Sequence, residues 1–232
     1  MKRFVVAISL CLTPALAHAQ KGVPPFQVYN NGGFADLHAD TSRLKSSIDT
    51  VTRTFSSSSC EAVEGSIGAA GTRRLLRFDV AIINHANADL VVGSPTNPNN
   101  PYYPYFHYSP CHNHYHIDGF TDYQLLNLDR SVAAFGHKQA FCLEDLIRYG
   151  TSASHGYVCG NQGITSGWAD IYVKTLSGQW VDITGVPDGD YILHVQVNAS
   201  GTFPEGQNLF GNVYEVQIHL PLPVPVKGQP SP

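Results

Sequence analysis

The sequence lacks the features of several common protein classes. It has no long amphipathic helical pattern and no internal repeat, which argues against a helical bundle or a repeat array. It has no surplus of positive charge, since 14 Lys and Arg stand against 18 Asp and Glu. This balance argues against nucleic acid or an anionic membrane as the main partner. After residue 19, no apolar run is long enough to span a membrane.

The first 19 residues have the pattern of a secretory signal peptide. A positively charged start precedes an apolar run that ends at Ala17, and a small-x-small cleavage site follows at 17–19. We expect cleavage after Ala19 and export of the mature chain to the periplasm or the cell exterior. One domain should then cover 20–220, and the Pro-rich tail at 221–232 should be disordered.

Cysteines are also few. Of the five, Cys11 belongs to the signal segment, which leaves Cys60, Cys111, Cys142 and Cys159. An even number in an exported chain indicates two disulfides, and free thiols are disfavoured in an oxidising compartment. The count alone leaves three pairings open.

The main pattern that is present is one of many short strands. These segments are rich in Val, Ile and Tyr, and turn signals such as Pro187-Asp188-Gly189 separate them. The expected strands are 73–84, 90–92, 112–128, 137–144, 179–184, 191–198 and 213–220. They predict an all-β chain, an antiparallel β-sandwich with long ordered loops and little helix.

One of the expected loops, 93–110, is long and rich in proline and aromatic residues. Loops of this length in a compact domain usually serve a function. Its aromatic side chains could line a substrate cleft or pack the loop onto the body of the protein. They are Tyr102, Tyr103, Tyr105, Phe106 and Tyr108.

Three histidines recur at every second position directly after this loop. In an extended strand, alternate side chains point to the same face, so His112, His114 and His116 should stand in a row. Asn113 and Tyr115 should face the other way. Three imidazoles can hold one transition metal and leave positions open for substrate or oxygen. The competing interpretation is a surface cluster, or three histidines that are satisfied separately.

Several motifs, taken in order, resemble those of the lysyl oxidase family. They are CHNHYH at 111–116, FTDYQLL at 120–126, GHKQAFCLED at 136–145, DIY at 170–172, QWVDIT at 179–184 and GDYILHVQVN at 189–198. The resemblance covers roughly 36–220. It implies that the three histidines bind copper. It also implies that Lys138 and Tyr172 are cross-linked into a lysine tyrosylquinone.

The activity implied by this resemblance is the oxidation of primary amines. The quinone would convert peptidyl lysine or a smaller amine into an aldehyde, molecular oxygen would reoxidise the ring, and hydrogen peroxide and ammonia would be released. For the general base, His137 matches a family histidine. Asp122 replaces a second one and is the other candidate, while Asp118 and Asp182 are better explained as structural residues.

The resemblance also selects among the disulfide pairings. It joins Cys60 to Cys111 and Cys142 to Cys159. The first bridge would then hold the segment that carries the three histidines.

A calcium site is a further implication of the resemblance. The matching ligands are Asp36, the carbonyl of Leu37, Glu205 and Asn212. Gln207 stands where the family has an acidic ligand, and the loop has one extra residue. Because calcium prefers charged oxygen ligands, this site should be weakened or lost.

Two other functions fit the histidines without the resemblance. A zinc hydrolase also uses three histidines with one open position and a nearby carboxylate as base. An exported β-sandwich could bind metal without any oxidase activity. The cross-link between Lys138 and Tyr172 separates these functions, because only the oxidase requires it.

Overall fold

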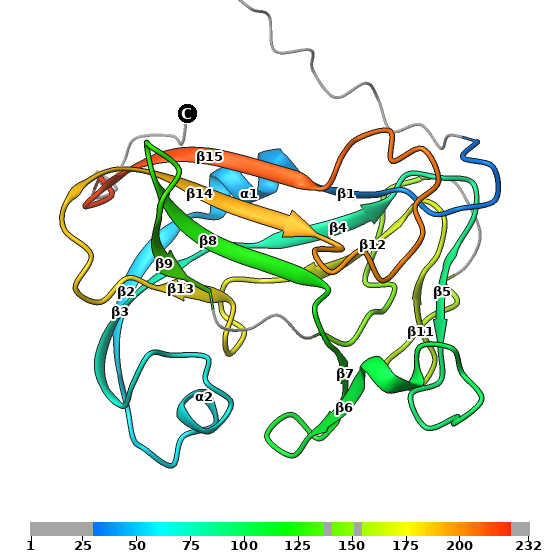
Figure 1. Ribbon diagram of the computed structural model, residues 1–232, viewed down its shortest axis with the longest axis horizontal. Coiled ribbons are helices and arrows are strands. Elements are labelled where there is room, and N and C mark those ends of the chain that lie inside the picture. The colour runs from blue at the N-terminus through cyan, green and yellow to red at the C-terminus, as the bar shows by residue number, and fades with distance from the viewer. Residues whose placement is uncertain (1–29, 137–140, 151–154, 224–232) are drawn as a thin grey trace, which may run out of the picture.

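The computed structural model describes residues 30–136, 141–150 and 155–223, and antiparallel strands dominate these ranges (Figure 1). The helical elements described are short. They are α1 Thr41–Ser47, α2 Cys60–Val63 and the 3-10 turn η1 Tyr103–Tyr105. The all-β prediction is therefore confirmed. The expected signal peptide, His137, Lys138 and most of the expected tail lie outside the described residues.

The first sheet has the strand order β15-β14-β8-β9, and all its pairings are antiparallel. Its strands are β8 Thr121–Asn127, β9 Val132–Phe135, β14 Gly189–Val197 and β15 Val213–Leu220. Along β14, the alternate side chains of Leu193, Val195 and Val197 are fully buried. They form part of the inner face of this sheet.

Two other sheets lie on the opposite side of the core, with the orders β1-β4-β12-β10 and β13-β3-β2. Their strands are β1 Leu37–Ala39, β2 Asp49–Phe55, β3 Gly71–Arg77, β4 Val80–Asn84, β10 Ile147–Arg148, β12 Trp168–Tyr172 and β13 Trp180–Asp182. Leu37, Leu76 and Ile82 share one buried apolar cluster with Leu193. The sheets therefore pack face to face, as in the predicted sandwich.

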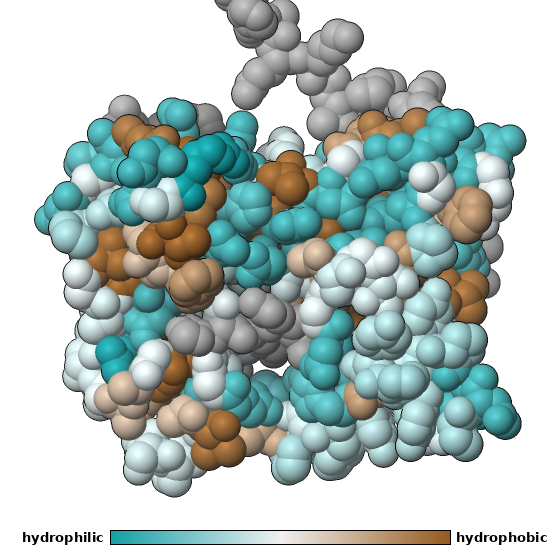
Figure 2. Space-filling model, in the orientation of Figure 1, coloured by the Kyte–Doolittle hydropathy of each residue, from teal (hydrophilic) through white to brown (hydrophobic). Residues whose placement is uncertain are grey.

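Two small antiparallel pairs extend from this body. β5 Leu90–Gly93 pairs with β11 Gln162–Ile164, and β6 Phe106–Ser109 pairs with β7 His114–Ile117. The β6–β7 hairpin and α2 lie at the same end of the molecule (Figure 1). The surface is hollowed between these two parts (Figure 2).

Both disulfides implied by the resemblance are present. Cys60 is bonded to Cys111, and Cys142 to Cys159, with Cα–Cα distances of 5.7 and 5.3 Å. The first bridge links α2 to the β6–β7 hairpin. The second links the segment after Phe141 to the chain just before β11.

The expected strand at 73–84 is wrong as a single element. β3 ends at Arg77, β4 begins at Val80, and the two strands belong to different sheets. Phe78 between them is fully buried, and Asp79 accepts hydrogen bonds from the Arg43 side chain and the Lys174 amide. The apolar pattern continues through this crossover, so it hides the change of sheet.

The expected strand at 137–144 is not found in its described part, 141–144. Phe141 forms only an isolated bridge with Ile117, through two backbone hydrogen bonds of 2.7 and 3.1 Å. Conversely, β12 was not predicted, because its five residues show no clear alternation. The bridge between Phe141 and Ile117 matters for the site, because it fixes Phe141 beside β7, the strand that carries two of the histidines.

Candidate functional site

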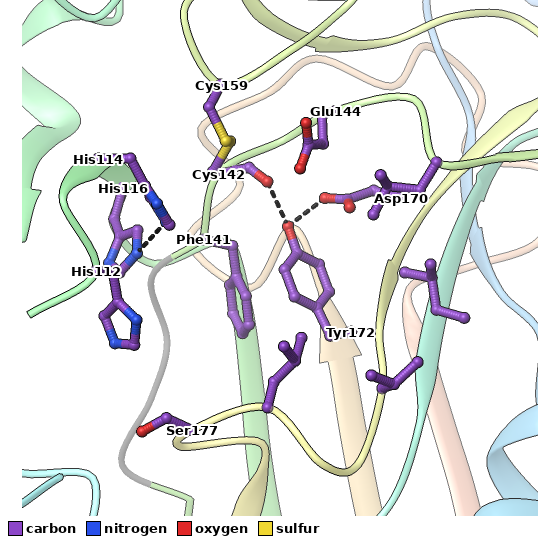
Figure 3. Close-up of a pocket in the computed structure, with 14 residues that line it drawn as sticks. His112, His114, His116, Phe141, Cys142, Glu144, Cys159, Asp170, Tyr172 and Ser177 are labelled. Carbon is purple, nitrogen blue, oxygen red and sulfur yellow. Dashed lines mark hydrogen bonds between the residues drawn. A yellow bond between two sulfur atoms is a disulfide. The ribbon is translucent and has the colours of Figure 1, made fainter.

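A cavity of about 440 Å³ is lined by all three histidines and by Tyr172 (Figure 3). Its walls come from the β6–β7 hairpin, from the segment around the Cys142–Cys159 disulfide and from β12 with the residues that follow it. In Figure 3 the Phe141 ring is drawn between the histidines and Tyr172. The fold thus brings the expected metal ligands and the expected quinone tyrosine to one space.

The three imidazole rings lie close together. Their centroids are 4.8 Å apart for His114 and His116, 5.3 Å for His112 and His116, and 5.9 Å for His112 and His114. The Nε2 atoms of His114 and His116 are 3.0 Å apart. Two nitrogen ligands at about 2.0 Å from a common metal are separated by about 3 Å. The spacing of these two nitrogens therefore fits a shared transition metal, whereas no choice of ring nitrogens brings all three histidines within 4.8 Å of one another.

The prediction of three histidines in a row along a strand is wrong for His112. Only His114 and His116 belong to β7, and His112 lies in the turn that joins β6 to β7. Asn113 has a φ of 58°, a left-handed conformation that Asn adopts more readily than most residues. This residue turns the chain, so the His112 ring reaches the others from the loop. Tyr115 faces away, as predicted, and its ring packs on Tyr108.

Glu64, which the sequence interpretation missed, contacts this turn. Its Oε2 is 2.9 Å from Nε2 of His112, and its Oε1 accepts a 2.5 Å hydrogen bond from the Ser109 hydroxyl. The Ser109 oxygen in turn accepts from the backbone N–H of His112 at 3.1 Å. No local sequence signal relates Glu64 to a histidine 48 residues further on.

Tyr172, at the end of β12, is nearly buried. Its hydroxyl is 2.8 Å from the carbonyl oxygen of Cys142 and in direct contact with the Asp170 carboxyl group, and its ring packs on Phe141 with centroids 4.2 Å apart. Burial, followed by the charge of Asp170, raises the pKa of Tyr172 well above its ordinary value. The tyrosine is thus held in one orientation and kept protonated.

Asp170 is fully buried, and burial is also the main cause that raises its pKa well above the ordinary value. The Tyr172 hydroxyl has one proton, and the Cys142 carbonyl can only accept. The hydroxyl donates to the Asp170 carboxyl group, and the Cys142 carbonyl oxygen is a second acceptor within reach. Glu144 also lines the cavity, and burial raises its pKa as well. The cavity therefore holds two carboxyl groups beside the tyrosine.

The structure places the other base candidates elsewhere. Asp122 lies on β8, accepts a 2.6 Å hydrogen bond from the Gln124 side chain and is not among the cavity-lining residues. Asp118 pairs with His107 at 2.6 Å, and Asp182 accepts from the amide of Gly68. Within the described residues, Glu144 and Asp170 are the carboxyl groups that reach the cavity.

The aromatic residues of the 93–110 loop do not line the cavity. Tyr102 packs on Phe203 with centroids 5.0 Å apart, and Phe106 packs against the main core. Tyr103, Tyr105 and Tyr108 are exposed. Of the two interpretations of this loop, packing onto the body holds for Tyr102 and Phe106.

The residues matched to a calcium site also come together. Asp36 is fully buried, and among the described residues neither of its carboxylate oxygens has a hydrogen-bond partner, nor does Oδ1 of Asn212. Glu205 lies beside them and accepts from the Leu37 amide at 2.7 Å and from Asn212 Nδ2 at 2.5 Å. Burial, then the charge of Glu205, raises the pKa of Asp36 to about 6. Buried oxygens without partners beside a second carboxylate fit a hard cation such as Ca²⁺.

A β-sandwich with three imidazoles and a buried tyrosine around one cavity defines a candidate metalloprotein. Comparison with known proteins identifies its family. The lysyl oxidase family model matches residues 39–220, so the chain belongs to the lysyl oxidase family. No helix in the described residues is both long and apolar enough to cross a membrane.

Three relatives show the extent of the similarity. The chain is 43% identical over 132 residues to lysyl oxidase homolog 2 of Homo sapiens and 44% identical over 132 residues to lysyl oxidase homolog 4 of Bos taurus. In both cases the match covers 55% of this chain and 16% of the relative. Lysyl oxidase homolog 2 of Gallus gallus is 41% identical over 133 residues, or 56% of this chain and 16% of the relative. The chain thus spans about a sixth of the length of the curated relatives it matches.

Proposed function

We propose that this protein is a copper- and quinone-dependent oxidase of primary amines. It converts peptidyl lysine or a smaller amine into an aldehyde and releases hydrogen peroxide and ammonia, with molecular oxygen as the oxidant. The observation that carries the proposal is that His112, His114 and His116 line the same cavity as Tyr172. Membership of the lysyl oxidase family supports it.

In this proposal the three histidines hold copper. Copper bound there supplies the electron and oxygen chemistry that turns a nearby tyrosine ring into a quinone. The remaining roles fall to the protein itself. Phe141 and the Cys142 carbonyl fix the Tyr172 ring, and Asp170 accepts a hydrogen bond from the tyrosine hydroxyl.

Lys138 is the proposed partner of Tyr172 in the cross-link. It lies outside the described residues, but only three residues before Phe141, whose ring contacts Tyr172.

We also propose that the protein is exported and binds calcium. Two disulfides suit an oxidising compartment. Asp36, the Leu37 carbonyl, Glu205 and Asn212 would hold the calcium ion.

Replacement of Lys138 tests the proposed function. Lys138→Arg keeps the positive charge but removes the primary amine that the cross-link needs. We expect it to retain copper and to lose amine-dependent peroxide release by at least about 100-fold. Lys45→Arg, on α1, is the matched control and should keep full activity. Peroxide release by Lys138→Arg at the wild-type rate would exclude the quinone mechanism.

A further inference from the structure

His112 differs from the other two histidines in how the fold holds it. His114 and His116 are fixed by the pairing of β7 with β6, where they lie opposite Ser109 and His107. His112 lies in the connecting turn and has no strand partner of its own. Contacts outside the pairing of β6 with β7 must therefore fix the position of His112.

These contacts come from α2 and the residue that follows it. Cys60 begins α2 and is bonded to Cys111, the residue before His112. Glu64 follows the last residue of α2, and its two carboxylate oxygens contact the His112 ring at 2.9 Å and the Ser109 hydroxyl at 2.5 Å. Because Ser109 also accepts from the His112 amide at 3.1 Å, both the backbone and the ring of His112 are held.

We propose that Glu64 is a positioning residue for the metal. Glu64 holds Nε2 of His112, which fixes the tautomer and the orientation of the ring. Nδ1 of His112 is then left for the metal. This inference rests on the proposed function only in taking His112 as a copper ligand. A carboxylate hydrogen-bonded to a ligating histidine typically raises metal affinity by about 10- to 100-fold.

A purely structural role for Glu64 predicts a lower unfolding temperature in Glu64→Ala and an unchanged copper affinity. The side chains of Glu64 and His112 are 24% and 20% exposed, so their ion pair is partly screened by water. Such pairs contribute little to the stability of a folded chain. Loss of the ion pair should therefore change the unfolding temperature of the copper-free protein little, and Ser109→Ala measures the separate cost of losing the Ser109 contact. A positioning role should appear in the metal affinity.

The test measures Cu²⁺ affinity of the full chain, by competition with a chelator of known affinity, together with the electron paramagnetic resonance spectrum of bound Cu²⁺. Glu64→Ala should weaken copper by about 10- to 100-fold and alter the nitrogen hyperfine pattern. Glu64→Gln keeps an oxygen that can accept from the imidazole, so it should recover part of the loss. Ser109→Ala, which removes the donor to Glu64, should give a smaller loss with the same spectral change. It serves as a second test if Glu64→Ala folds poorly.

The matched control is Glu215→Gln. Glu215 makes the same kind of carboxylate–imidazole contact, 2.9 Å to His194 on β14, and neither residue lines the cavity. This variant should bind copper like the wild type.

Two results would overturn the role of Glu64. Unchanged affinity and spectrum in Glu64→Ala would show that it does not position His112. Tighter binding would show that Glu64 competes with the metal for His112. Neither the copper affinity nor the spectrum depends on an amine substrate or on a formed quinone. If the oxidase proposal fails, the protein will bind copper without forming a cross-link, so the two failures can be distinguished. If His112→Ala leaves the affinity unchanged, His112 is not a ligand and both proposals lose their basis.

Discussion

At the residue scale, the proposed chemistry depends on the surroundings of one phenol. Tyr172 is held by Phe141, the Cys142 carbonyl and the Asp170 carboxyl group, and the pKa values of Tyr172 and Asp170 are raised mainly by burial. A buried tyrosine that stays protonated needs a group that takes its proton when the ring is oxidised. Asp170 is the group in contact with the hydroxyl.

Asp170→Asn tests this role. The amide keeps the volume but cannot exchange a proton with the tyrosine, so cross-link formation should slow by about 100-fold or more. Copper affinity should stay within about twofold, because the contacts of Asp170 are with Tyr172 and not with the histidines. The measurement is the time course of cross-linked peptide after copper addition, with the exposed Asp188→Asn as control. Cross-linking at the wild-type rate would rule out Asp170 as the proton acceptor.

Asp36 gives the proposed calcium site a pH dependence. Its pKa in the folded chain is raised to about 6. In calcium-free protein this carboxyl group therefore favours the folded state below its unfolded pKa of about 4, and the contribution is lost as the pH rises through 6. Calcium binds the ionised carboxylate, so it should raise the melting temperature at pH 7.5 and have little effect at pH 4.5.

The expected rise at pH 7.5 is about 5 °C or more when calcium is at 100 times its Kd. Asp36→Asn should abolish this response and raise the melting temperature of the calcium-free protein at that pH. Thermal unfolding with calcium and with a chelator measures both effects. A calcium response that is equal at the two pH values, or that survives in Asp36→Asn, would contradict the assignment.

At the scale of elements, the β6–β7 hairpin presents two faces with different roles. His114 and His116 point toward the cavity, while Tyr115 packs on Tyr108 with ring centroids 5.2 Å apart. Tyr115→Ala should therefore cost about 1 kcal/mol or more of stability and change copper affinity by only a few-fold. His114→Ala should lower copper affinity by at least about 100-fold. Chemical denaturation and copper competition separate the two effects, and equal losses of copper would refute the strand geometry.

The elements also show which parts of the fold are predictable from the sequence. β14 and β15 follow clear Val, Ile and Tyr patterns between turn residues, and both appear close to the expected bounds. The crossover at Phe78 and Asp79 is hidden, because the apolar pattern continues through it. The turn at Asn113 is hidden within a period-two run of histidines, because a left-handed residue leaves no trace in hydropathy.

In the candidate site, too, some residues are predictable from the sequence and others are not. Motifs locate the three histidines and Tyr172, but not the carboxyl groups that reach them through the fold. Glu64 reaches His112 from 48 residues away, and Asp122, which the resemblance suggested as a base, lies away from the cavity. Such contacts depend on sheet packing and on the Cys60–Cys111 disulfide, which local patterns do not encode.

At the scale of the whole molecule, two packed layers of strands support one cavity at the end of the sandwich where the disulfides lie. Cys60–Cys111 holds the hairpin with the histidines, and Cys142–Cys159 holds the segment that follows Phe141. The chain spans about a sixth of the length of the curated relatives it matches. We propose that this domain forms its own quinone from Lys138 and Tyr172.

The most direct test is a peptide map of the exported protein after copper loading in air, with its disulfides reduced. We predict a covalent link between the peptides that contain Lys138 and Tyr172, which should be absent in Lys138→Arg. Two separate peptides from protein that demonstrably binds copper would contradict the claim and favour a metal-binding module without oxidase activity.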